Sequence, residues 1–132
     1  MSTELTLLAW TLVLALIQIF LPTIGRTRQL GSKWNAGPRD EPLPPPGKIT
    51  GRLERAQKNL FETLPIFIAA VLIAHIAGRE GDLTRWGAML YFFGRLAHVP
   101  LYALGVTGLR SLAWIVSFVG LVMILAAILL PV

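Results

Sequence analysis

The sequence of 132 residues contains no cysteine and few charged residues, since Asp, Glu, Lys and Arg together make up only 14% of it. Without cysteine the chain cannot form a disulfide, a thiolate metal site or a cysteine nucleophile. Hydrophobic residues make up 55% of the chain and the mean hydropathy is +0.66, which excludes an ordinary water-soluble domain. Because the chain has no cysteine, any sulfur chemistry would need a thiol supplied by a ligand.

Metal ligands are also scarce. The chain has two histidines, His75 and His98, and seven acidic residues. These residues do not follow the close spacing that His, Asp and Glu ligands of a metal ion usually show. The sequence therefore predicts no metal site.

Long runs without charge predict four membrane-spanning helices, at about residues 5–24, 59–78, 86–104 and 111–132. About 20 apolar residues cross a hydrocarbon core at about 1.5 Å per residue. No segment alternates apolar and polar residues as a barrel strand would. We expect a single all-α integral membrane domain over residues 1–132, built as a bundle of four transmembrane helices. A signal peptide is the competing interpretation of the first run, but the basic residues that should precede it are missing.

The positive charge is concentrated in one part of the chain. The net charge is +5, and eight of the twelve basic residues lie between Arg26 and Lys58. The positive-inside rule therefore places the first loop, about residues 25–50, in the cytoplasm and both termini on the opposite side. Proline and glycine are frequent in this loop, which favours an extended chain. Because the basic residues flank membrane spans, we do not expect nucleic acid as a partner.

Two polar stripes interrupt the apolar runs. The segment that leads into the second predicted span carries Arg52, Arg55, Asn59 and Glu62, with Lys58 beside them, and the third span carries Arg95, His98 and Tyr102. Their spacing of three or four residues gives each stripe one helix face. A charge in hydrocarbon costs at least about 2.5 to 3.5 kcal/mol unless it is paired or hydrated. The stripes therefore predict either a buried Glu62–Arg95 ion pair, which would be purely structural, or a ligand.

The fourth predicted helix begins with Arg110 and Ser111, close to the end of the third. A helix N-terminus has unpaired N–H groups and a partial positive charge, so these residues form a candidate anion site. The alternative is a capping serine beside an interfacial arginine. Together the stripes predict a cavity for a small ligand with two carboxylates and an amine, which glutathione fits. A neighbouring cation and hydroxyl would stabilise its thiolate, so Arg110 and Ser111 are our candidate catalytic pair.

Three segments form a distinctive set: Arg55–Thr63 (RAQKNLFET), Gly94–Tyr102 (GRLAHVPLY) and Leu109–Ser111 (LRS). They resemble the membrane-associated proteins in eicosanoid and glutathione metabolism, the MAPEG family, which includes microsomal prostaglandin E synthases, glutathione transferases and a non-enzymatic member. The resemblance implies a homotrimer with glutathione between neighbouring subunits. It also implies that glutathione is contacted by Arg55, Lys58, Asn59, Glu62, His98, Tyr102, Arg110 and Ser111, with Arg52 as a weaker match. An arginine at the end of the first helix should contribute, with Arg26 and Arg28 as candidates.

The sequence therefore predicts a bacterial inner-membrane enzyme that uses glutathione as a transferase or peroxidase. Its second substrate would be a lipophilic electrophile or a lipid hydroperoxide that arrives from the membrane lipids. The alternatives are a scaffold protein that binds lipid or glutathione without turnover, and a structural subunit of a larger membrane complex.

Overall fold

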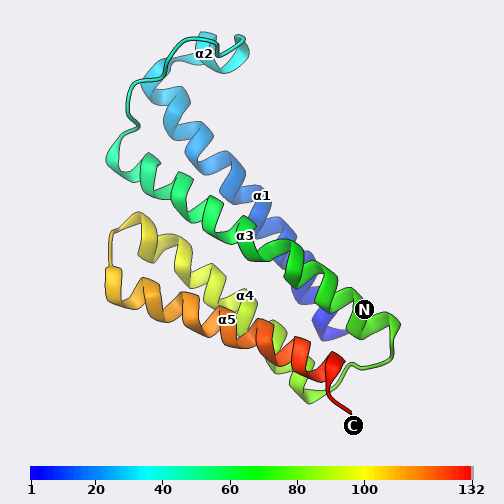
Figure 1. The fold of residues 1–132 in the computed structure, drawn as a ribbon. Helices are drawn as coiled ribbons and strands as arrows, with labels where there is room; N and C mark the ends of the chain where they lie inside the picture. Colours follow the sequence, from blue (N-terminus) through cyan, green and yellow to red (C-terminus); the bar gives the residue numbers. More distant parts are fainter. Residues whose placement is uncertain (132) are drawn as a thin grey trace.

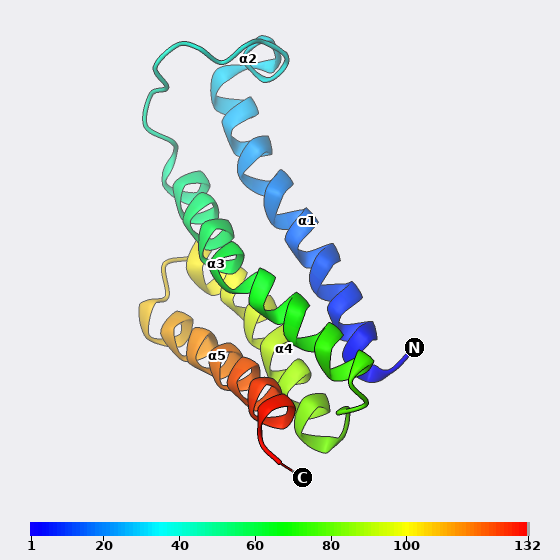
Figure 2. The same cartoon turned by 45° about the vertical axis from the view of Figure 1, so that its right-hand side comes forward.

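The computed structural model describes residues 1–131, which form five α-helices and no strand. The helices are α1 (Thr3–Leu30), α2 (Ser32–Ala36), α3 (Lys48–Ile76), α4 (Asp82–Ala103) and α5 (Thr107–Leu129). The expected all-α class is confirmed. Figure 1 shows that the chain begins and ends at the same end of the molecule, which we call the terminal end. Helix α2, the Pro-rich segment and the α4–α5 turn lie toward the other end, the loop end (Figure 2).

The first helix is longer than the predicted span. Helix α1 continues through Pro22 to Leu30 and ends at Gly31, whose positive φ of 91° suits glycine. A proline inside a helix removes one hydrogen bond without necessarily ending the helix, and the buried face of α1 continues to Pro22. The segment without helix is therefore residues 37–47 and not the whole of 25–50, because α2 and the first residues of α3 are also helical.

Helices α1, α3 and α5 are long and apolar enough to cross a membrane. Helix α4, with 22 residues, is long enough to cross a membrane but is not among these apolar helices. It contains Arg95 and His98 in its second half, and both side chains are buried in the protein rather than turned outward. Three of the four expected spans therefore qualify by length and composition, and the fourth, α4, stays a predicted span whose polar residues face the interior.

The core lies where α3 meets the other long helices. Leu60, Phe67 and Val71 of α3 are fully buried, as is Ile124 of α5. The ring of Phe67 stacks on that of Tyr91 of α4 with the centroids 4.0 Å apart. These apolar contacts hold α3 against α4 and so set the relative position of the two polar stripes.

Helices α4 and α5 pack closely because glycines stand at their contacts. A Cβ atom added to Gly94 of α4 would lie 2.9 Å from both the Ala113 carbonyl oxygen and the Ser117 nitrogen of α5. At the other end of the pair, a Cβ on Gly120 would lie 2.7 Å from the Tyr91 nitrogen and closer still to the Gly87 carbonyl oxygen. These distances are too short for a real side chain. The glycines therefore allow a close approach that fixes the start of α5 relative to the end of α4.

Hydrogen bonds tie α1 to α4 at the terminal end. The Thr84 hydroxyl donates to the buried Glu4 carboxylate at 2.6 Å. The Ser2 hydroxyl donates to Glu80 at 2.7 Å, and the other oxygen of Glu80 lies 3.1 Å from Nδ1 of His75. The hydrogen bond from Ser2, supported by His75, lowers the pKa of Glu80 below its ordinary value although partial burial opposes this. These contacts set the register of α1 against α4.

The predicted arginines of α1 lie away from the end of α4. Nε of Arg26 is 2.8 Å from the Glu54 carboxylate, and its Nη1 donates to the Pro44 carbonyl at 2.9 Å. Arg28 is exposed. Arg26 therefore anchors the Pro-rich segment to α3 and is not available as a free cation.

Candidate functional site

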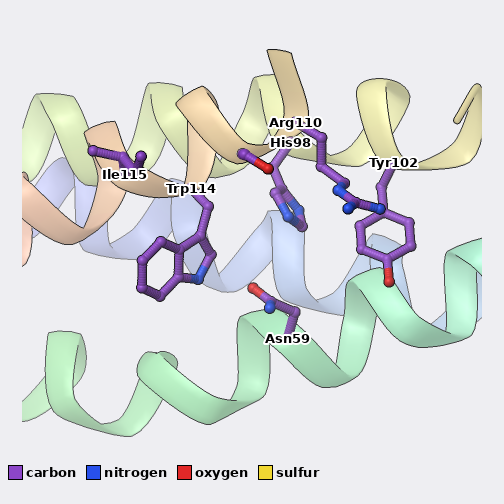
Figure 3. Close-up of a pocket in the computed structure, with 7 residues that line it drawn as sticks. Asn59, His98, Tyr102, Arg110, Trp114 and Ile115 are labelled. Carbon is purple, nitrogen blue, oxygen red and sulfur yellow. The ribbon is translucent and has the colours of Figure 1, made fainter. Parts of the chain in front are cut away.

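A cavity of about 410 Å³ opens between α3 and the α4–α5 pair. Figure 3 shows the side chains of α4 and α5 pointing across this space toward α3. The lining residues are Asn59, His98, Tyr102, Arg110, Ser111, Trp114 and Ile115. Five of the ten predicted site residues are therefore brought together here.

Helix α4 contributes His98 and Tyr102, which are one turn apart on the same face. Their ring centroids are 5.4 Å apart. His98 is 2% exposed, and its Nδ1 has no hydrogen-bond partner among residues 1–131. The imidazole ring of His98 therefore forms part of the cavity wall, with Nδ1 buried in the protein.

Helix α5 contributes Arg110, whose guanidinium carbon lies 4.6 Å from the centroid of the Tyr102 ring (Figure 3). Such stacking leaves the N–H edge of the guanidinium free for an anion. The helix begins at Thr107 with Val106 as its cap, and the N–H of Arg110 already donates to the Val106 carbonyl. Neither Arg110 nor Ser111 is at the helix start, so an anion would be held by their side chains and not by their N–H groups.

The buried ion pair between Glu62 and Arg95 is not formed. Nη1 of Arg95 donates instead to Oδ1 of Asn59 at 2.8 Å, while Glu62 is exposed on α3. Arg95 is 1% exposed, and its Nε and Nη2 have no partner among the residues described. Arg95 thus lies behind Asn59 and fixes the direction of that amide.

The other predicted residues of α3 lie outside the cavity. Nη1 of Arg52 donates to the Ala103 carbonyl at 3.3 Å, so this side chain closes the end of α4. The guanidinium of Arg55 lies 6.0 Å from the centroid of the Tyr102 ring and is exposed. Lys58 is exposed as well. Of these three side chains, that of Arg55 lies beside a residue of the cavity wall, Tyr102.

Trp114 and Ile115 were not among the predicted site residues, although the sequence contains a signal for both. They follow Arg110 and Ser111 by four residues, which puts them on the same face of α5. The Trp114 ring stacks on Phe118 at 5.2 Å with an angle of 10° between the planes. The cavity therefore has a polar part near the α4–α5 turn and an apolar wall further along α5.

The sequence model of the MAPEG family matches residues 7–130 of the chain. The chain belongs to the MAPEG family. No curated protein and no solved structure gives a significant match. Together with the three apolar helices, membership of MAPEG identifies an integral membrane protein.

The MAPEG family includes glutathione transferases and related enzymes, and the cavity has the chemistry that a small anion requires. Arg110 supplies a permanent positive charge, and Tyr102 and Ser111 supply hydroxyl groups. No carboxylate lines the cavity, so an anion there would meet no negatively charged side chain of the cavity wall. No group of three or more His, Asp or Glu that could hold a metal ion occurs within residues 1–131.

Proposed function

We propose that this MAPEG protein is a membrane-embedded glutathione-dependent transferase or peroxidase that acts on a lipophilic electrophile or a lipid hydroperoxide. The observation that carries the proposal is the placement of Arg110 over Tyr102 in a cavity whose far wall, at Trp114, is apolar. A charged thiol cosubstrate and a lipophilic partner would need these two surfaces side by side.

Glutathione fits the groups present. A volume of about 410 Å³ is within the usual range of about 300 to 1,000 Å³ for small-molecule sites. One carboxylate would pair with Arg55 at the rim, and the sulfur would lie near Arg110 and the Ser111 hydroxyl. The amide of Asn59 keeps its N–H groups for the ligand because Arg95 occupies its oxygen.

The ammonium group of glutathione has no carboxylate partner within this cavity. We propose that the chain forms a homotrimer and that Glu62, exposed on α3, supplies this carboxylate across a subunit boundary. An exposed carboxylate on a membrane-crossing helix is costly unless another chain or water covers it. Lys58 and Arg55, exposed on the same helix, would be covered in the same way.

In conjugation, the thiol proton leaves to solvent and Arg110 stabilises the thiolate that remains, since a nearby cation favours the charged form. The sulfur then attacks an electrophilic carbon of the lipophilic substrate, and the leaving group departs with the bonding electrons. With a hydroperoxide, the sulfur takes the distal oxygen and the lipid leaves as an alcohol after gaining a proton. A second glutathione then attacks the oxidised sulfur, which gives the disulfide and water.

We also propose that the loop end faces the cytoplasm of a bacterial inner membrane, with both termini on the other side. The basic residues exposed at this end support it, among them Arg28, Lys33, Arg39 and Lys48. This orientation would let glutathione enter from the cytoplasm, while the lipophilic substrate enters from the bilayer.

The test is a turnover screen of the purified protein with glutathione against an aryl halide and a lipid hydroperoxide. We expect turnover with at least one of them. Replacing Arg110 with Ala should weaken transition-state stabilisation by about 1.5–3 kcal/mol, or roughly 10- to 150-fold in kcat/KM, because a charge-assisted hydrogen bond is lost. Thermal stabilisation by glutathione without turnover would instead identify a binding scaffold, and no stabilisation would favour a structural subunit.

A further inference from the structure

Five buried polar atoms without a partner come from three side chains of α1 and α4. They are Oε1 and Nε2 of Gln18, Nε and Nη2 of Arg95, and Nδ1 of His98. Each of the three residues is no more than 2% exposed. Buried polar groups in folded proteins nearly always have a hydrogen-bond partner from protein or ordered water. Three such side chains, one on α1 and two on α4, therefore require an explanation.

The three residues stand at similar distances along α1 and α4 from the terminal end. Helices α1 and α4 both start at the terminal end, where Thr84 donates to Glu4. Gln18 follows Glu4 by the same number of residues that His98 follows Thr84. At 1.5 Å per residue, both are roughly 21 Å along their helices from that hydrogen bond, and Arg95 is about one turn before.

The backbone adds another acceptor at this depth. Pro22 follows Gln18 by one helical turn and has no N–H to donate to the Gln18 carbonyl. Both residues are buried. The region around Gln18 thus combines a free amide group with a carbonyl oxygen that lacks its usual helical partner.

We propose that Gln18, Arg95 and His98 hold ordered water behind the wall of the cavity, and that this water fixes the tautomer of His98. Buried waters typically make about three hydrogen bonds to polar groups that would otherwise be unsatisfied. The two free nitrogens of Arg95 can only donate. A water that accepts from Arg95 directs its hydrogens away from it, toward Oε1 of Gln18 and Nδ1 of His98.

The tautomer follows from this polarity. If Nδ1 accepts a hydrogen bond from water, the neutral ring carries its proton on Nε2. Since Nδ1 is the nitrogen buried in the protein and the ring lines the cavity, Nε2–H is the group presented to a ligand. Gln18, which does not line the cavity, is therefore a positioning residue that acts through His98.

One consequence rests on the proposed function. With Nε2–H in the cavity, His98 joins Arg110, Tyr102 and Ser111 as a donor, so that all four side chains can bind an anionic glutathione. Loss of the water that holds this tautomer would remove one donor, which corresponds to a rise in KM for glutathione of about tenfold.

The direct test is nitrogen NMR of the protein labelled at histidine, because ring nitrogen shifts distinguish the two tautomers. The chain has only two histidines, so His75→Gln assigns the signals of His98. We expect wild-type His98 to carry its proton on Nε2. In Gln18→Met, which keeps the length of the side chain but removes its polar end, we expect a shift toward the Nδ1–H form. His75 should not change.

Thr11→Val is the matched control. Thr11 is a buried polar residue on the same face of α1, but its hydroxyl donates to the Leu7 carbonyl of its own helix. This variant should leave the His98 signals unchanged. A wild-type His98 that is protonated on Nδ1 would overturn the proposal, even if Gln18→Met does not fold. The same signals in Gln18→Met and wild type would also overturn it. Because the spectra are recorded without glutathione, they test the tautomer of His98 whether or not the protein binds glutathione.

Discussion

The close packing of α4 and α5 leads to a quantitative prediction for Gly120→Ala. The new Cβ atom would lie 2.7 Å from the Tyr91 nitrogen and 2.9 Å from Cβ of Leu90, and closer to the Gly87 carbonyl oxygen. Ordinary contacts are 3.4 Å or more, so the two helices would have to separate by several tenths of an ångström. Overpacking of this kind costs typically about 1–3 kcal/mol.

A gain in helix propensity of about 1 kcal/mol partly offsets that cost when alanine replaces glycine. Gly108→Ala isolates this gain, because a Cβ atom at Gly108 of α5 meets nothing within 4 Å. We therefore expect Gly108→Ala to be slightly stabilising and Gly120→Ala to be about 1–3 kcal/mol less stable than Gly108→Ala.

The assay is reversible unfolding in mixed micelles, in which rising amounts of a denaturing detergent unfold the helices. The free energies of unfolding of wild type and both variants are compared under the same conditions. A Gly120→Ala protein that is as stable as Gly108→Ala would refute the close approach of α4 and α5.

Two further predictions concern polar contacts, one beside the cavity and one at the terminal end. Asn59→Leu removes the only hydrogen-bond partner of the buried Arg95 among the residues described. The free energy of unfolding should therefore fall by about 1.5–3 kcal/mol in the same assay. A loss no larger than that of Lys48→Leu, at an exposed site of the loop end, would contradict this. At the terminal end, the lowered pKa of Glu80 means that its ionised form contributes stability above its ordinary pKa of 4.5, and that this contribution is lost as the pH falls through the lowered value. When unfolding is followed from pH 4.5 downward, the free energy of unfolding should fall less in Ser2→Ala than in the wild type, because the hydrogen bond from Ser2 is the largest cause of the lowered pKa. The same dependence of this free energy on pH in Ser2→Ala and wild type would count against that role of Ser2.

The sequence was sufficient to predict the helical class and part of the site. Periodicity placed His98 and Tyr102 on one face of a helix, and the short α4–α5 connection brought Arg110 near them. Periodicity does not show how far a helix turns its polar face toward a neighbour. Lys58 and Glu62 are exposed on α3 and do not line the cavity of the single chain, so their place in the site stays a prediction.

The partner of Arg95 could not be predicted from depth alone. Glu62 and Asn59 are one turn apart on α3, and both were within reach of a long guanidinium side chain. The choice of Asn59 depends on the rotation of α3, which is set by apolar packing such as that of Phe67 on Tyr91. The end of α1 was also missed, because the predicted span ended near residue 24, where the uncharged run gives way to Arg26, whereas the helix continues to Leu30.

The central claim is that Arg110 stabilises a glutathione thiolate within the membrane domain. The most direct measurement is ultraviolet difference absorption of the thiolate when glutathione is added to the detergent-solubilised protein. We expect a band that saturates with glutathione in the wild type and is lost in Arg110→Gln, while Gly108→Ala retains it. A wild-type protein that binds glutathione without this band, or a band that is unchanged in Arg110→Gln, would contradict the claim.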